Sequence, residues 1–227
     1  MESLEVWALS LTKRRVLSYL DLTFCGSGFI GGARLAKLLE KYLGDLQIEN
    51  LDRRFIVVTA ELATAHEQWL RSGSLVEAVR ASYALPGVFP PRLIDGRWLI
   101  DGALVNPVPV SVCRAFGARL VIAVSLHTDT YGKISLAEGL ELADENGDGD
   151  VPLTLAETLR TSPQRLIMKQ LFGTSAKAPG VGSVMLGALN IIMDRLGRSR
   201  LAGDPPDVLV APRVGPISDM DFVWAAE

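Results

Sequence analysis

The uninterrupted apolar run at residues 120–124, Leu-Val-Ile-Ala-Val, constrains the fold more than any other segment. A strand with one face in water alternates apolar and polar side chains. A continuous apolar run is instead typical of a strand buried on both faces of a parallel sheet. Parallel strands are joined by crossovers that are usually helical, and these helices cover the sheet. The run therefore predicts an α/β fold with a mainly parallel sheet.

Other segments show the strand and helix patterns that such a fold requires. Runs rich in β-branched or aromatic residues predict strands at 54–59, 68–70, 98–100 and 207–211, the second as a hairpin partner of the first. Helical periodicity predicts helices at 1–22, 35–42, 74–83 and 184–198. With no repeat and no linker, the sequence predicts a single domain over residues 1–227, with a polar surface loop at about 132–152.

Two of these helices carry further signals. Ser74 and Glu77 form a capping-box pattern, in which a serine hydroxyl and a glutamate carboxylate satisfy free amides at a helix start. In the last helix, Met185, Leu189, Ile192 and Leu196 recur at helical spacing, which predicts a stripe packed in the core. A transient contact with a membrane surface stays open as an alternative role for that stripe.

Composition excludes several classes of function. A formal net charge of -3 with no basic stripe gives no footprint for nucleic acid. No apolar run approaches the roughly 18 residues needed to span a bilayer. His66 and His127 are the only histidines, which argues against a Ser-His-Asp triad and against a multi-histidine metal site. Cys25 and Cys113 are too few to indicate a disulfide framework.

Asp101 is the strongest candidate for a catalytic residue. A short apolar strand carries it to a strand end, where α/β enzymes place their ligands. Gly102 lets the backbone turn sharply, and the two prolines of Asn106-Pro107-Val108-Pro109 stiffen the loop that follows. A carboxylate held in this way suits a general base, provided that a hydroxyl lies within about 3 Å. The simpler alternative is that Asp101-Gly102 is only a turn.

The segment around Asp101 resembles the patatin-like phospholipase family, in particular its bacterial cytosolic branch. The resemblance rests on five stretches: residues 81–91, Asp101-Gly102-Ala103, residues 106–109, the apolar strand at Val121 and residues 199–207. It implies a three-layer α/β fold and a Ser-Asp dyad in which Asp101 accepts the proton. It also implies phospholipid, lysophospholipid or acyl-thioester substrates, no metal or organic cofactor, and a cytoplasmic location.

The chain departs from the family pattern in one respect. The family places a Gly-x-Gly-x-x-Gly oxyanion loop and a Gly-x-Ser-x-Gly nucleophile elbow before the aspartate, and no Gly-x-Ser-x-Gly occurs in this sequence. The nearest approach, residues 173–177, lacks the last glycine and follows Asp101. We therefore expect an N-terminally incomplete domain that lacks the first strands and the serine. Such a chain would hydrolyse nothing by itself; the alternative is a non-catalytic binding remnant of the same fold.

Two glycine-containing motifs suggest other functions. Residues 26–31 spell Gly-x-Gly-x-x-Gly, which with Glu61 as the ribose-binding acid would indicate a nucleotide-binding oxidoreductase. The preceding residues 20–24 form a poor core strand, so a flexible turn explains the glycines better. Residues 144–151 match the first half of a calcium loop, but the twelfth position is Leu155 in place of glutamate. A solvated acidic loop is the preferred interpretation there.

Overall fold

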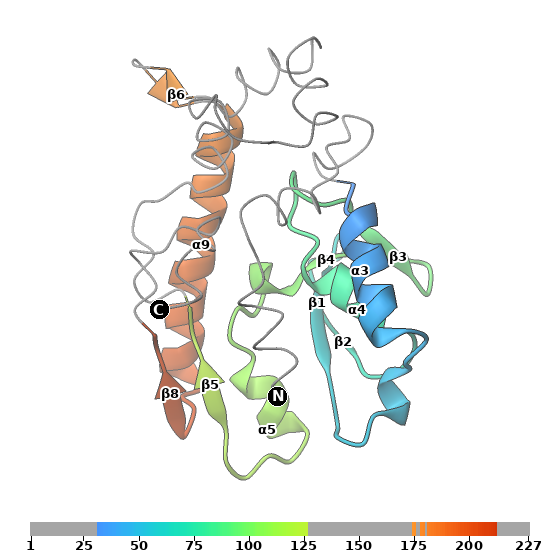
Figure 1. Ribbon diagram of the computed structural model, residues 1–227. Helices are drawn as coiled ribbons and strands as arrows, with labels where there is room; N and C mark the ends of the chain where they lie inside the picture. The colour runs from blue at the N-terminus through green and yellow to red at the C-terminus, as the bar shows by residue number, and fades with distance from the viewer. Residues whose placement is uncertain (1–30, 127–173, 176–177, 180, 213–227) are drawn as a thin grey trace, which may run out of the picture. The chain divides into compact units, whose positions relative to one another are not determined.

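The structure is a computed structural model that describes residues 31–126, 174–175, 178–179 and 181–212 (Figure 1). The described residues fall into two compact units, one with residues 31–126 and 190–212, the other with those between 174 and 189. Helices and sheets together confirm the predicted α/β class. The predicted helix at 1–22 and the predicted polar loop at 132–152 lie outside the described residues.

A four-stranded sheet forms the centre of the larger unit. Its order is β2-β1-β4-β3, with β1 (Val57–Glu61), β2 (Glu67–Leu70), β3 (Arg92–Ile94) and β4 (Arg97–Asp101). Every pair in it is antiparallel, which differs from the mainly parallel sheet that the sequence predicted. Residues 62–66 connect β1 to β2, and residues 95–96 connect β3 to β4. Both connections are too short for a parallel crossover. The β1–β2 hairpin was predicted from the sequence.

The two-residue turn between β3 and β4 has a clear local cause. Asp95 and Gly96 both have positive φ, 49° and 76°, the backbone that a tight hairpin turn between twisted strands requires. Aspartate and glycine tolerate this conformation better than other residues. β3 was not predicted, because three residues between a proline and this turn give no readable alternation.

A parallel pair is present as a second, two-stranded sheet. β5 (Ile122–Val124) lies beside β8 (Val208–Val210), as predicted for residues 207–211 (Figure 1). Val121 and Ala123 are buried against Val108, Val110 and partly buried Leu201. Ile122 and Val124 are 60% and 59% exposed, so the prediction that residues 120–124 are buried on both faces is wrong. Among the residues that the structure describes, one face of this pair packs on a core and the other is exposed.

The helices α3 and α4 lie where helical periodicity in the sequence predicted helices. α3 (Ala33–Leu43) ends at Gly44, whose N–H donates to Glu40 O with a φ of 56°. α4 (Leu75–Ser82) packs on β1 and β4, and Leu75 and Ala78 meet Ile48 and Val57 in one core. The remaining short elements are η1 (Ile48–Asn50), η2 (Gly102–Leu104), α5 (Val110–Ala115), β6 (Thr174–Ser175) and β7 (Ala178–Pro179).

The long helix α9 (Val181–Gly203) corrects the predicted core stripe. Met185 and Ile192 are 61% and 55% exposed, whereas Met193 is 4% exposed. The buried face is therefore offset from the stripe that sequence spacing suggested. No helix in the described part of the chain is both long and apolar enough to cross a membrane.

Candidate active site around Asp101

Asp101 is the last residue of β4 and lies opposite Thr59 of β1, a residue that is fully buried. Its N–H donates to Ala84 O at 3.1 Å, and its Oδ1 accepts from Ala103 N at 2.8 Å. The second contact caps η2, so the carboxylate is oriented by the turn that it begins. The structure thus places Asp101 at a strand end followed by a tight turn, as the sequence predicted. Asp101 is half-buried, and a backbone N–H holds its carboxylate.

Gly102 is needed because β1 passes close to it. A Cβ built at Gly102 would lie 2.2 Å from Val58 O and 3.1 Å from Thr59 N. No side chain fits within such distances of a backbone carbonyl. From the sequence, a glycine is expected here for its freedom to turn; the structure shows that the close approach of β1 requires it.

The motif at residues 81–91 lies directly against the Asp101 turn. Ala81 and Ala84 are fully buried, and Ala84 O receives the Asp101 N–H. Ser82 Oγ donates to Val58 O at 2.9 Å, so the end of α4 is tied to the carbonyl that faces Gly102. The structure brings together two stretches that the sequence could relate only by resemblance.

Asn106 fixes the loop after Asp101 from the other side. Its side chain is 3% exposed and donates from Nδ2 to Glu67 Oε1 at 2.9 Å and to Ser111 Oγ at 3.2 Å. Its N–H donates to Gly102 O at 2.9 Å. Glu67 Oε1 also accepts from Trp69 Nε1 at 2.7 Å. We call Asn106, Glu67, Ser111 and Trp69 the Glu67 network.

The Glu67 network extends to α9 through Arg200. Arg200 Nη2 donates to Val105 O at 3.0 Å and lies 3.9 Å from Glu67 Oε2. Because buried polar groups are costly unless they are paired, this network fixes the course of residues 102–106. Glu67 and Arg200 were not predicted as part of the site from the sequence. The sequence had no signal for them, since they meet the loop across 39 and 95 residues of chain.

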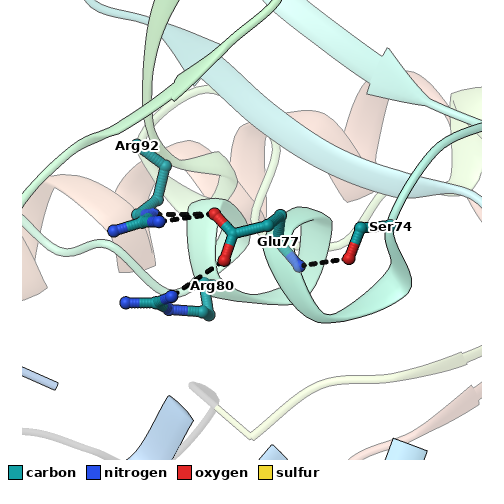
Figure 2. Close-up of polar contacts among 4 residues, drawn as sticks. All are labelled: Ser74, Glu77, Arg80 and Arg92. Carbon is teal, nitrogen blue, oxygen red and sulfur yellow. Dashed lines mark hydrogen bonds and ion pairs between the residues drawn. The ribbon is translucent and has the colours of Figure 1, made fainter. Parts of the chain in front are cut away.

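A charged cluster lies on α4 and β3 (Figure 2). Ser74 Oγ accepts from Glu77 N at 3.3 Å, so half of the predicted capping box forms. The Glu77 carboxylate does not return to Ser74 but accepts from Arg80 Nη1 at 2.8 Å and from Arg92 Nε at 3.1 Å. Burial by itself would raise the pKa of Glu77, but the hydrogen bonds and charges of Arg92 and Arg80 outweigh it and lower that pKa below 4.5. The cluster ties β3 to α4.

This cluster predicts a specific sensitivity to acid. Because the pKa of Glu77 is depressed in the folded state, the stability that its ionisation adds is present above the unfolded pKa and is lost as pH falls through the folded pKa. Urea unfolding at pH 7 and pH 3.5 should show a smaller pH-dependent loss for Glu77→Gln than for the unchanged chain. Glu40→Gln, an exposed position on α3, is the control and should keep the full loss. An unchanged pH dependence in Glu77→Gln would contradict the assignment.

The other candidates from the sequence are not gathered at this site. His66 is exposed at the β1–β2 connection, and His127 lies outside the described residues. So do the half calcium loop and all of the Gly-x-Gly-x-x-Gly stretch except Gly31. Glu61 ends a strand that pairs only antiparallel, which differs from the parallel unit of a dinucleotide fold. Among the residues that the structure describes, no three His, Cys, Asp or Glu side chains gather in a way that could hold a metal ion.

Comparison with known proteins gives consistent results. The family "Patatin-like phospholipase" matches residues 4–114. An uncharacterised NTE family protein of Mycobacterium bovis is 35% identical over 132 residues, which cover 58% of this chain and 37% of the relative. Human patatin-like phospholipase domain-containing protein 6 is 35% identical over 135 residues, 56% of this chain and 10% of the relative. A second NTE family protein of Mycobacterium bovis is 28% identical over 201 residues, 88% of this chain and 30% of the relative.

The chain therefore spans well under half the length of these curated relatives. The family match covers β1 to β4, Asp101 and most of α5, which are the elements that build the candidate site. Over residues 4–114, just under half of its length, this chain matches the patatin-like phospholipase family.

Proposed function

We propose that Asp101 is the general base of an acyl-ester hydrolase whose serine nucleophile lies outside these 227 residues. Three observations support this. Asp101 stands in the Asp-Gly-Ala motif, its carboxylate is oriented by the Ala103 N–H, and the surrounding backbone is fixed by Gly102 and the Glu67 network. The orientation of the Asp101 carboxylate is the observation that carries the proposal.

In the proposed reaction the serine Oγ attacks the acyl carbonyl carbon of a lipid while its proton passes to the Asp101 carboxylate. Backbone amides of a glycine-rich loop would hold the oxyanion of the tetrahedral intermediate. The proton then passes from Asp101 to the departing alkoxide, or thiolate for a thioester, which leaves an acyl-serine. Asp101 next takes a proton from water, whose oxygen attacks the acyl carbon, and returns it to the serine. Phospholipid, lysophospholipid and acyl-thioester substrates all fit these steps.

No metal or organic cofactor takes part in this scheme. We further propose a cytoplasmic protein that touches a membrane surface only transiently, to reach its lipid substrate. The net charge of -3 gives it no general attraction to anionic membranes, so such contact would be brief.

The first test uses the 227-residue chain itself. Because no Gly-x-Ser-x-Gly occurs in it, we expect no turnover of a short-chain nitrophenyl ester above the background seen with Asp101→Asn. Turnover that disappears in Asp101→Asn would mean that a hydroxyl within the chain acts as nucleophile. Turnover that persists in Asp101→Asn would separate the activity from this site altogether.

The missing serine motif also favours a second candidate, a binding module that has lost catalysis. The two differ in what the genomic DNA upstream of the Met1 codon encodes. An in-frame extension with Gly-x-Gly-x-x-Gly and Gly-x-Ser-x-Gly is the result that the hydrolase proposal requires. A stop codon and a promoter there, together with tight binding of a lipid by the chain alone, would favour the module.

A further inference from the structure

A pocket of about 340 Å³ lies at the start of β1, ahead of the residue that pairs with Asp101. It is lined by Ile48, Glu49, Leu51, Arg53, Arg54, Phe55, Ile56, Arg71 and Phe116. Phe55 and Ile56 directly precede β1, and Arg71 directly follows β2. Thr59, further along β1, is the residue that pairs with Asp101. Four residues of strand span about 13 Å, so the pocket is separate from the candidate active site.

The pocket has a marked excess of positive charge. Three arginines are among the lining residues, against one acidic residue, Glu49, whose Oε2 accepts from Gly73 N at 2.8 Å. Arg54 Nη1 donates to Phe116 O at 2.6 Å and thereby holds one wall. Within the described part of the chain, the guanidiniums of Arg53 and Arg71 make no hydrogen bond or ion pair. Two unpaired cations therefore border the same depression.

The rest of the lining is apolar. Ile48 is 3% exposed and belongs to the core of the sheet, while Phe55 is 44% exposed. Phe116 meets Trp69 edge-on at 5.6 Å between ring centroids. A hydrophobic floor excludes water from one side of a bound anion, which strengthens its attraction to the arginines. Such a floor also contacts an apolar group that is attached to the anion.

We propose that this pocket binds a phosphomonoester group, carried by a molecule with an apolar portion. The planar guanidinium offers paired donors that match phosphate oxygens, and two unpaired ones can engage a dianion together. A carboxylate offers fewer oxygens and a single charge. The source is either a soluble phosphate ester or the head group of a lipid. The proposal does not depend on the role of Asp101.

The test follows the Nε–H signals of the arginines by NMR during titration of the 227-residue chain. The probes are inorganic phosphate, dihexanoyl phosphatidic acid and dihexanoyl phosphatidylcholine, the last of which carries no phosphomonoester. We expect the Arg53 and Arg71 signals to shift with the first two and not with the third. Arg53→Gln with Arg71→Gln should weaken phosphatidic acid binding by about tenfold or more, since both unpaired cations are removed.

The matched control removes the same charge elsewhere, with Lys37→Gln on α3 and Arg97→Gln on β4. It should leave the affinity within about twofold, because exposed charges beyond a Debye length of about 8 Å are screened at physiological salt. Tighter binding of phosphatidic acid than of inorganic phosphate would support a phosphomonoester that carries an apolar portion, and equal binding would contradict the apolar portion. An equal loss in the control pair, or shifts with phosphatidylcholine alone, would overturn it. So would unmoved arginine signals.

Discussion

Under the proposed hydrolase mechanism, replacing Asp101 by asparagine is expected to lower kcat/KM about a thousandfold in a polypeptide that also supplies a serine nucleophile, with little change in stability. Asparagine keeps a carbonyl oxygen that can accept from Ala103 N, so the turn at η2 should persist. It cannot accept the serine proton, and a positioned general base contributes about 10²- to 10⁴-fold to the rate. The measurement is hydrolysis of a short-chain acyl ester, with thermal unfolding as the check on folding.

Asp95→Asn is the matched control for this substitution. Asp95 is exposed in the turn between β3 and β4 with a φ of 49°, a conformation that asparagine also tolerates. The same change of charge in the same hairpin should leave kcat/KM within about twofold, since surface substitutions away from such features have small effects. If Asp101→Asn behaved like Asp95→Asn, Asp101 would not be the base.

Replacing Gly102 by alanine is expected to destabilise the fold by about 3 kcal/mol or more. Overpacking usually costs about 1–3 kcal/mol, and here the clash is with backbone, 2.2 Å from Val58 O, where no side chain can rotate away. Relief requires β1 and β4 to separate at the position where Thr59 pairs with Asp101. Since a domain is stable by only about 5–15 kcal/mol, urea unfolding should detect the change readily.

Gly203→Ala supplies the comparison for Gly102→Ala. Gly203 ends α9, and no atom lies within 4 Å of a Cβ added there. Alanine should be neutral or stabilising by a few tenths of a kcal/mol at this position, because glycine is the poorer helix former. Equal losses at the two glycines would contradict the close approach of β1 to Gly102.

Local patterns in the sequence predicted most of the elements. The apolar runs at 54–59, 98–100 and 207–211 correspond to β1, β4 and β8, and Gly44 ends α3 as expected. The antiparallel direction of the four-stranded sheet was not predicted, because the alternation of strands with helices and the apolar run at 120–124 both favour a parallel sheet. The short connections at 62–66 and 95–96 would have indicated antiparallel pairing.

At the candidate site, the sequence indicated Asp101 and its turn but not what holds them. Asn106 was interpreted as part of a stiff loop, whereas it is a buried donor to Glu67 and Ser111. Its partners come from β2 and α5, and Arg200 comes from α9. Contacts of this kind depend on how distant segments meet, and no periodicity within a single segment encodes them.

The two sheets differ in how far apart their paired residues lie along the chain, which has a consequence for the order of folding. Arg92 pairs with Leu99 seven residues later, whereas Ile122 pairs with Val208 86 residues later. Closing the longer loop costs more chain entropy, so the β3–β4 hairpin should form early and the β5–β8 pair late. Doubling the segment between β5 and β8 would add only about 0.6 kcal/mol to that cost. Changes in the length of that segment should therefore have little effect on stability. In contrast, even one residue inserted at Asp95-Gly96 would change the pairing register of β4, the strand that presents Asp101.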